Sequence, residues 1–393
     1  MVAILSAVAI PVGRYMPGDG ARGGTYETDC LVRVAAQAMR EVGVSGKDID
    51  SVILTMNPPN TQQVGFSAHF ASRLGLQCRG QMSEVMNLGI SGGLAFDQGV
   101  NDILLGRADI VLVGGVLYQS AIKGHVGMEQ GIRSVGDVEF QSPFGFTPIS
   151  WYALDAARYM HDFDLTPDDL AHVAVKSRRW ARDNDVAQFR EDLTFDEVMA
   201  SDMIVDPLRL HDIPQRADGA VCFLLARDEI VADSRKPVVR VAARGFAHDG
   251  HHQVGDHPHD MTSFPAAQQA CTRSLADWGR SLQDIDLFEL YAPCSITELI
   301  VMESIGLSAR GQAKHDLLQG RTSLGGDLPV NSSGGCLSRG HPPALTPLYG
   351  LYEIWQQLSQ QAGKRQIQNA QSGFHICELG NYNAALAHIM EVA

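Results

Sequence analysis

Apolar residues along this chain follow two alternating patterns. Continuous apolar runs, such as ADIVLVGGV at 108–116, are typical of strands that are buried on both faces. In stretches between such runs, as in 28–42, apolar residues recur every three or four positions, which predicts amphipathic helices. Strands that alternate with helices in this way predict an α/β fold with a largely parallel sheet.

The predicted elements continue to the end of the chain. Strands are expected at 2–12, 49–56, 84–87, 108–116, 217–225, 238–247, 285–291, 373–379 and 383–391. Helices are expected at 28–42, 67–74, 92–105, 150–162, 167–184, 265–278 and 295–306, with one more after Pro347.

Two features divide the chain. From about 118 to 203, loops rich in Gly, Ser and Phe surround the helices, and this region predicts an inserted loop domain that covers a site. Residues 233–237 have the composition of a linker, and the strand–helix order before them is similar to the order after them. We therefore predict two halves, 1–235 and 236–393.

Composition and charge limit the function classes. The 393 residues are enough for two or three domains, and the net charge of −14 argues against a nucleic-acid or anionic-membrane surface. Seven cysteines without a CxxC pair predict reduced thiols and no structural zinc site. The apolar start lacks a basic segment and no apolar run is long enough to span a bilayer, so we expect a cytoplasmic protein.

A glycine-flanked histidine is the strongest candidate for chemistry. It lies in NSSGGCLSRGHP at 331–342 and is followed by Thr346-Pro347, an expected N-cap with proline at the first helical position. His341 would then stand at a helix N-terminus, where it can donate a hydrogen bond to a developing oxyanion. The alternative is a structural histidine in a Gly-rich turn.

Three further groups of residues each have two interpretations. A basic cluster at 176–182 is the best local candidate for binding phosphates, although a solvated helix face is the commoner explanation. The His- and Asp-rich stretch HDGHHQVGDHPHD at 248–260 has metal-binding residue types, but its spacing fits no defined site, and we favour a polar loop near the site entrance. Asp218 precedes a buried strand and is expected to tie loops together.

The chain resembles the thiolase superfamily, nearest to its sterol-carrier-type, lipid-transfer branch. The resemblance extends over essentially the whole chain and depends on an ordered set of motifs. These are MNLGISGG at 86–93, ADIVLVGGV at 108–116, VDPLRLHDIPQRADGA at 205–220, ELYAPCSITELIVMESIGL at 289–307, NSSGGCLSRGHP at 331–342 and the late Cys377. It implies a five-layered αβαβα sandwich of two pseudo-symmetric halves with an inserted loop domain, and a homodimer.

The resemblance also implies the site. The histidine that activates the acyl-accepting cysteine falls on His341, the late proton-moving cysteine on Cys377, and the second oxyanion-hole position on Tyr291. The acyl-accepting position itself falls on Gly89, so the nucleophile is absent, and Ser91 next to it is expected to cap a helix. Further substrate-binding candidates are His125, Tyr118, Phe144, Phe146, Lys176 and Arg179.

Without a cysteine at position 89, an acyl-enzyme cannot form there. The remaining groups suit retro-aldol cleavage of a β-hydroxyacyl-CoA, in which His341 stabilises a thioester enolate and Cys377 or Tyr291 transfers a proton. The alternatives are acyl transfer with another nucleophile, or a non-catalytic subunit that binds acyl-CoA. Coenzyme A would be part of the substrate, no covalent cofactor or metal is expected, and the branch implies a small partner with a zinc ribbon and an OB-fold.

Overall fold

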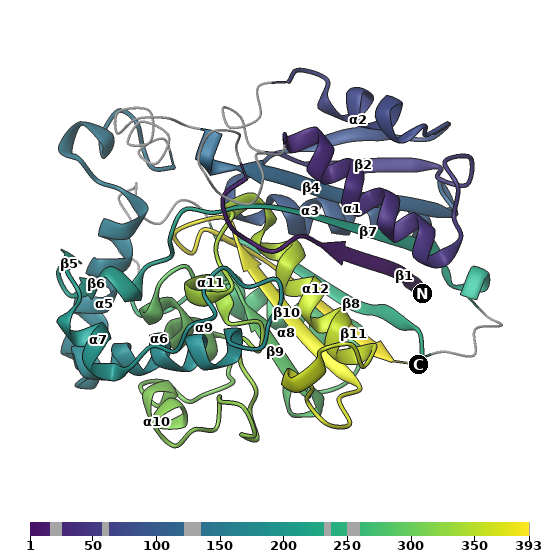
Figure 1. Cartoon of the computed structure of the whole chain (residues 1–393). Coiled ribbons are helices and arrows are strands. Elements are labelled where there is room, and N and C mark those ends of the chain that lie inside the picture. Colours follow the sequence, from purple (N-terminus) through teal and green to yellow (C-terminus); the bar gives the residue numbers. More distant parts are fainter. Residues whose placement is uncertain (16–25, 57–62, 122–134, 232–236, 250–259, 393) are drawn as a thin grey trace.

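The computed structural model describes residues 1–15, 26–56, 63–121, 135–231, 237–249 and 260–392. Their main feature is a nine-stranded mixed sheet with the order β3-β2-β4-β7-β1-β8-β11-β10-β9 (Figure 1). The strands are β1 (Val2–Ala9), β2 (Ser51–Thr55), β3 (Met82–Val85), β4 (Ile110–Tyr118), β7 (Asp218–Arg227), β8 (Val239–His248), β9 (Leu287–Leu290), β10 (Ser372–Glu378) and β11 (Ala384–Val392).

The same pairing pattern occurs twice in this sheet. In the first half, β3, β2 and β4 are parallel, and β7 and β1 follow as antiparallel neighbours. In the second half, Val330 forms a parallel bridge to Phe288 of β9, β9 is parallel to β10, and β11 and β8 follow as antiparallel neighbours. The pairing of β1 with β8 joins the halves into one sheet. The expected linker at 233–237 lies largely outside the described residues, so the boundary at 235 stays a prediction.

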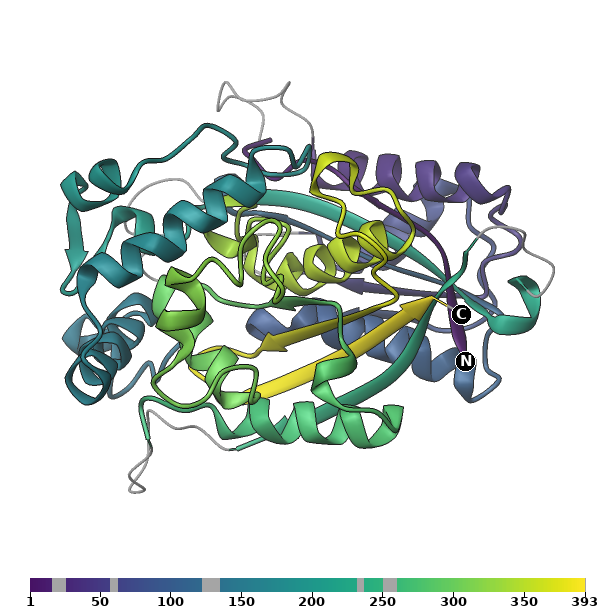
Figure 2. The same ribbon diagram turned by 90° about the horizontal axis from the view of Figure 1, so that it is seen from below.

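Helices cover the sheet in layers, as the sequence resemblance leads us to expect. Helices α3 (Ser91–Leu104) and α12 (Thr346–Leu358) pack together and form the inner layer between the two halves. Helices α1 (Glu27–Val42) and α2 (Phe66–Leu74) cover the outer side of the first half, and α8 (Pro265–Trp278) and α9 (Ser295–Ser304) cover that of the second (Figures 1 and 2). The apolar faces of α3 and α12 form one buried cluster with β1, β4 and β7.

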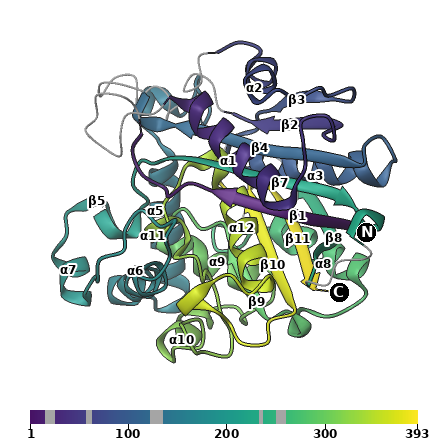
Figure 3. The same cartoon turned by 45° about the vertical axis from the view of Figure 1, so that its right-hand side comes forward.

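The segment between β4 and β7 leaves the sheet and packs beside the second half (Figure 3). It contains α5 (Pro148–Phe163), α6 (Pro167–Ala181), α7 (Phe195–Ala200) and a small ribbon of β5 (Met203–Val205) and β6 (Leu208–Arg209). Helix α6 lies against α9, α10 (Ala313–Leu318) and α11 (Gly335–Ser338). The segment between β4 and β7 thus contacts the part of the chain that leads to His341. None of the described helices is long and apolar enough to cross a membrane.

Candidate active site

Distant segments meet at the carboxyl ends of β9 and β10. Tyr291 follows β9, and its N–H donates to the Ile376 carbonyl of β10 at 2.9 Å. The turn before α3 joins them, because the Gly89 N–H donates to the Leu379 carbonyl at 3.0 Å. The ring of His341 stands edge-on to that of Tyr291, with 5.3 Å between centroids. Three residues that the sequence singles out therefore lie together, at the kind of strand ends where α/β folds bind ligands.

Position 89 has no space for a side chain. A Cβ atom on Gly89 would lie 2.7 Å from Tyr291 Oη and 2.8 Å and 3.1 Å from the carbonyl oxygens of Glu378 and Leu379. Ser91 Oγ accepts from the Asn87 N–H at 2.7 Å and donates to the Leu88 carbonyl at 2.6 Å, which closes the turn around Gly89. The Tyr291 hydroxyl thus fills the volume that a side chain at position 89 would occupy.

Thr346 fixes the orientation of His341. The sequence predicts Thr346 as the N-cap of α12, but the helix begins at Thr346 itself, and this side chain makes no cap bond. Instead, Thr346 Oγ1 lies 2.9 Å from Nδ1 of His341 and donates to the Pro342 carbonyl at 3.1 Å. Because a hydroxyl has one proton, Thr346 accepts from Nδ1–H, and Nε2 keeps its lone pair.

This tautomer changes the expected role of His341. Burial, followed by the positive charge of Arg339, lowers the pKa of His341 to about 3, so the ring is neutral at pH 7. A neutral ring with its proton on Nδ1 accepts a hydrogen bond at Nε2. With this tautomer His341 offers an acceptor at Nε2, whereas the sequence predicts a donor to an oxyanion.

Tyr291 is able to act as a hydrogen-bond donor among these residues. Its ring is packed with Ile90, Cys377, Ala384 and Leu386 in a small buried cluster. Burial raises the pKa of Tyr291 far above its ordinary value, with smaller contributions from nearby thiols and from Glu378. The phenol therefore stays protonated at neutral pH and can donate a hydrogen bond.

Cys377 is enclosed below the site. A Cβ atom added to Gly93 would lie only 2.7 Å from its Sγ, so the sulfur is packed directly against this glycine. The Sγ–H group donates to the Leu386 carbonyl at 3.5 Å. Burial raises the pKa of the Cys377 thiol well above its usual range, so a thiolate is disfavoured. This environment does not support the proton-accepting role that the resemblance implies for Cys377.

Two buried carboxyl groups next to the site are absent from the sequence interpretation. Glu378 accepts from Tyr152 Oη at 2.6 Å and from the Tyr382 N–H at 3.1 Å, and burial raises its pKa to about 7. Both carboxyl oxygens of Asp155 are buried without a hydrogen-bond partner in the described part of the chain. Burial and the charge of Glu378 raise the pKa of Asp155 well above its usual value. The spacing of Tyr152 and Asp155 on an otherwise apolar face of α5 is the only sequence signal for this group.

A buried polar network positions the His341 loop. Asn331 donates to Glu298 at 2.7 Å through Nδ2 and accepts from the Leu290 N–H at 2.8 Å, next to Tyr291. Lys176 forms a buried ion pair with the same Glu298 and donates to the Val330 carbonyl at 3.3 Å. Lys176 is thus a structural residue, which corrects its prediction as a phosphate ligand, because its ammonium group is enclosed.

The other predicted substrate-binding residues lie elsewhere. Tyr118 is fully buried under α1 and its hydroxyl lies 2.8 Å from Cys30 Sγ, so the structure places it in the core and away from Tyr291. Phe144 is exposed at 82% and Phe146 at 36%, and Arg179 is on the exposed face of α6. His125 lies outside the described residues.

Two interpretations outside the site are also resolved in part. Asp218 ties loops together as expected, since it accepts from the N–H groups of Tyr15 at 2.7 Å and Ser120 at 2.8 Å. Most of the His-rich stretch, 250–259, is not among the described residues. Within the residues that are, no group of three His, Cys, Asp or Glu side chains is placed to hold a metal ion.

Sequence comparisons agree with this arrangement over nearly the whole chain. Two family profiles match: "Thiolase, N-terminal domain" over residues 2–228 and "Thiolase C-terminal domain-like" over 247–391. An acetyl-CoA acetyltransferase of Methanothermobacter thermautotrophicus is 31% identical, over 92% of this chain and 93% of that protein. A steroid side-chain-cleaving aldolase of Thermomonospora curvata is 28% identical, over 81% of this chain and 82% of the aldolase.

A solved structure with the same fold is an Ltp2–ChsH2(DUF35) aldolase. It superimposes with a TM-score of 0.85 at 22% identity, covering 100% of this chain and 97% of that one. Two halves of equal strand order, with a site between the turn before α3 and the loop before α12, define an enzyme of the thiolase type. The chain belongs to the thiolase family, as the two matching profiles and the 31% identical acetyltransferase establish.

Proposed function

We propose that this enzyme cleaves a β-hydroxyacyl-CoA by a retro-aldol reaction through a thioester enolate, without an acyl-enzyme. The observation that carries the proposal is the Tyr291 hydroxyl, which closes position 89 to any nucleophilic side chain. Gly89 is the position at which the family resemblance puts the acyl-accepting cysteine. The relatives include both an aldolase and an acetyltransferase, so the site and not the family decides between C–C cleavage and acyl transfer.

The base in this reaction is Nε2 of His341. It takes the proton of the β-hydroxyl group, the oxygen electron pair forms the new carbonyl, and the Cα–Cβ bond breaks. The bonding pair passes into the thioester and gives the enolate. Burial lowers the pKa of His341, so Nε2 is unprotonated throughout the neutral range. The same shift weakens the imidazole as a base, and the negative charge that develops on the substrate beside it stabilises the imidazolium as it forms.

Tyr291 stabilises the enolate. Its phenol remains protonated at neutral pH and can donate to the thioester oxygen as negative charge develops there. The imidazolium of His341 then returns its proton to Cα, which yields the shortened acyl-CoA and an aldehyde or ketone. The proton removed from the hydroxyl is the proton added to carbon, so no further acid is consumed and Cys377 is not needed.

The test is to incubate the protein with a panel of β-hydroxyacyl-CoA esters and to follow carbonyl release and intact protein mass in the same samples. We expect an aldehyde or ketone and a shortened acyl-CoA, with no added mass on the protein. An acyl adduct would reject the lyase mechanism in favour of acyl transfer. Bound esters without product or adduct would contradict a catalytic role.

Two variants test the assigned roles. His341→Gln and Tyr291→Phe should each lower kcat by roughly 10²- to 10³-fold, because each removes one group that acts on the transition state. Tyr352→Phe is a matched control, since its hydroxyl accepts from Gln356 on the same helix and lies outside the site. Rates within a few-fold of wild type for either site variant would remove that residue from the mechanism.

We also propose a small partner protein of the zinc-ribbon and OB-fold kind. The structural neighbour named above is a complex of Ltp2 with ChsH2(DUF35), which supports this expectation. Co-expression with a protein of that class and size-exclusion chromatography would test it; a chain that elutes alone would contradict the proposal. The same experiment reports whether the chain forms the expected homodimer.

A further inference from the structure

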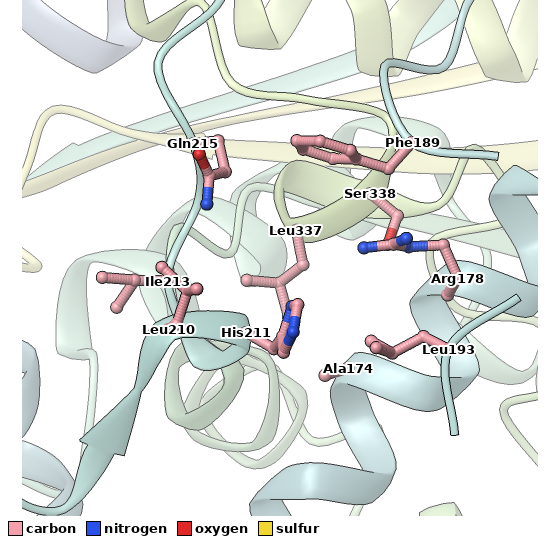
Figure 4. A pocket seen from close by; sticks show the side chains of 10 residues that line it. All are labelled: Ala174, Arg178, Phe189, Leu193, Leu210, His211, Ile213, Gln215, Leu337 and Ser338. Carbon is pink, nitrogen blue, oxygen red and sulfur yellow. The ribbon is translucent and has the colours of Figure 1, made fainter. Parts of the chain in front are cut away.

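A cavity of about 160 Å³ lies between α6, the 3-10 turn at Leu210–Asp212 and α11 (Figure 4). Each of these segments contributes one polar side chain to its lining, namely Arg178, His211 and Ser338, and Gln215 from the chain after the turn adds a fourth. The remaining wall is mainly apolar. The cavity therefore combines a small volume with several hydrogen-bond donors that converge from different parts of the fold.

Arg178 is the dominant charge in this cavity. Its guanidinium donates to Ser338 Oγ at 3.3 Å and to the Glu191 carbonyl at 3.3 Å, and it lies 5.0 Å from the ring centroid of Phe189. Partial burial lowers the pKa of Arg178, and the charges of Glu191 and Glu197 oppose this effect only in part. In the described part of the chain, no carboxylate lies within ion-pair distance of Arg178, so a half-buried cation is held by neutral acceptors.

His211 and Ser338 add donors beside this cation. Ser338 Oγ accepts from Arg178, which leaves its own hydroxyl proton to point toward another acceptor. His211 lines the same cavity, and burial followed by the charge of Arg178 lowers its pKa, so its neutral ring retains one N–H. A guanidinium, a hydroxyl and an imidazole around a small cavity are the groups that bind phosphate.

Two segments of the cavity wall are connected along the chain to the proposed site of cleavage. Leu337 and Ser338 of its wall belong to α11 and precede His341 by four and three residues. Gln215, on another wall, precedes Arg216, which forms a parallel backbone bridge with His341. Two chain segments thus lead directly from the cavity to the proposed base.

We propose that this cavity binds a phosphate group of the CoA thioester, an inference that rests on the proposed function. The overall charge of −14 makes such a local cationic site necessary for a highly anionic substrate. The basic cluster on α6 contributes through Arg178 alone, because Lys176 is enclosed in its ion pair and Arg179 faces away from the cavity.

Binding of a phosphate should also couple to protonation. Burial is the first cause that lowers the pKa of His211 and the charge of Arg178 is the second; a bound anion offsets the charge of Arg178 and attracts a proton to the ring, so it favours the imidazolium form. Affinity for CoA should therefore rise as pH falls from about 8 to about 6, and this rise should be absent in His211→Gln. Glu197 is the carboxylate that faces His211, and its charge acts in the same way in the free and bound protein.

Calorimetric titration of the full chain with CoA, dephospho-CoA, pantetheine and inorganic phosphate tests the proposal. Arg178→Met should weaken CoA binding by about 10- to 100-fold, as expected for a lost charged hydrogen bond, and leave pantetheine binding unchanged. Arg178→Lys should recover part of the affinity. The matched control is Arg179→Met, the exposed neighbour on the same helix, which should bind CoA as wild type does. Thermal melting of each variant verifies folding.

The outcomes separate the cavity from the reaction. Equal losses in Arg178→Met and Arg179→Met, or an equal loss of pantetheine binding, would overturn the proposal. Binding of inorganic phosphate but not CoA through Arg178 would reject CoA as its source. If the wild-type protein binds CoA through Arg178 but cleaves no ester, the proposed retro-aldol function is wrong and the phosphate site in this cavity is retained.

Kinetics give a second test when the wild-type protein is active. Arg178→Met should then raise KM for the CoA ester and preserve kcat; an unchanged KM would also reject the phosphate site.

Discussion

The contact between Tyr291 and Gly89 determines which chemistry the site can perform. A tyrosine hydroxyl in the place of a side chain at position 89 removes the volume for an acyl-enzyme and adds a proton donor at the same point. Tyr291 after β9 and Gly89 in the turn before α3 are therefore matched to each other. A larger residue at position 89 would clash with the tyrosine, and a smaller residue at position 291 would leave an empty space.

This contact predicts the effect of Gly89→Ala. The added Cβ would lie 2.7 Å from Tyr291 Oη, so the ring must move, and we expect a loss of about 1–3 kcal/mol in stability together with lower kcat. Urea denaturation and steady-state kinetics measure the two effects. In Gly89→Ala/Tyr291→Phe, the stability loss should be smaller than the sum of the single losses; strict additivity would show that the two residues do not touch.

Cys377→Ala should retain kcat within about a few-fold. The thiol is buried and protonated at neutral pH, and it donates to a backbone carbonyl, so no thiolate is available to act as a base. Stability should fall modestly because the substitution leaves a small cavity. A drop in kcat of two orders of magnitude or more would restore the proton-transfer role that the family resemblance implies.

The site could be predicted in part from the sequence. His341, Tyr291 and Gly89 are found by their motifs, and the structure brings them together. Their roles depend on contacts that no local pattern encodes. The tautomer of His341 is set by a threonine that the sequence indicates as a helix cap, and the enclosure of Lys176 depends on a carboxylate 122 residues away.

At the scale of elements, the alternation between continuous apolar runs and apolar residues spaced three or four positions apart predicts nearly all long strands and helices. The helix expected at 265–278 has the bounds of α8, and most others agree within a few residues at each end. The elements that the sequence misses are short: α7, α10, α11, β5 and β6. Elements of two to six residues carry too few positions for a periodic signal, and tertiary contacts rather than propensity stabilise them.

A buried ion pair joins Lys176 of helix α6 to Glu298 of α9, and Glu298 also accepts from Asn331 at the start of the His341 loop. This arrangement yields a stability prediction. Lys176→Met should destabilise the fold by about 3–5 kcal/mol, because Glu298 would keep an unpaired buried charge. Glu298→Gln in the same chain should recover part of this loss and keep a partner for Asn331. Arg179→Met, on the exposed face of the same helix, should change the free energy of unfolding by less than about 0.5 kcal/mol. A similar small change in Lys176→Met would contradict the role of the ion pair.

At the scale of the whole molecule, the buried His375 and His388 and the half-buried His341 make the fold sensitive to acid. Burial lowers the pKa of His341 and His388 to about 3, and that of His375 well below 6.5. Between pH 3 and the usual histidine value the unfolded chain binds more protons than the folded one, so stability should rise with pH across this window and level off above it. The raised pKa of Glu378, about 7, acts in the opposite direction between its usual value and neutrality.

The test is chemical denaturation from pH 4 to 8. His388 lies in the core beside His375 and Phe96, with both ring nitrogens lacking a hydrogen-bond partner among the described residues. His388→Leu should reduce the acid-side slope by up to about 1.4 kcal/mol per pH unit, the value for one proton. His69→Gln, at an exposed position of α2, should leave the slope as it is. An unchanged slope in His388→Leu would assign the acid sensitivity to other groups.

Closure of position 89 has a consequence for how the enzyme tolerates its chemical surroundings. A catalyst that depends on a thiolate stops when peroxide oxidises it or an alkylating reagent blocks it. Here the proposed turnover involves an imidazole and a phenol, and of the seven cysteines six are buried and only Cys78 is partly exposed. Iodoacetamide and mild peroxide should therefore leave cleavage largely intact at doses that inactivate enzymes with a catalytic cysteine. A cell that contains this enzyme would retain this reaction during oxidative stress.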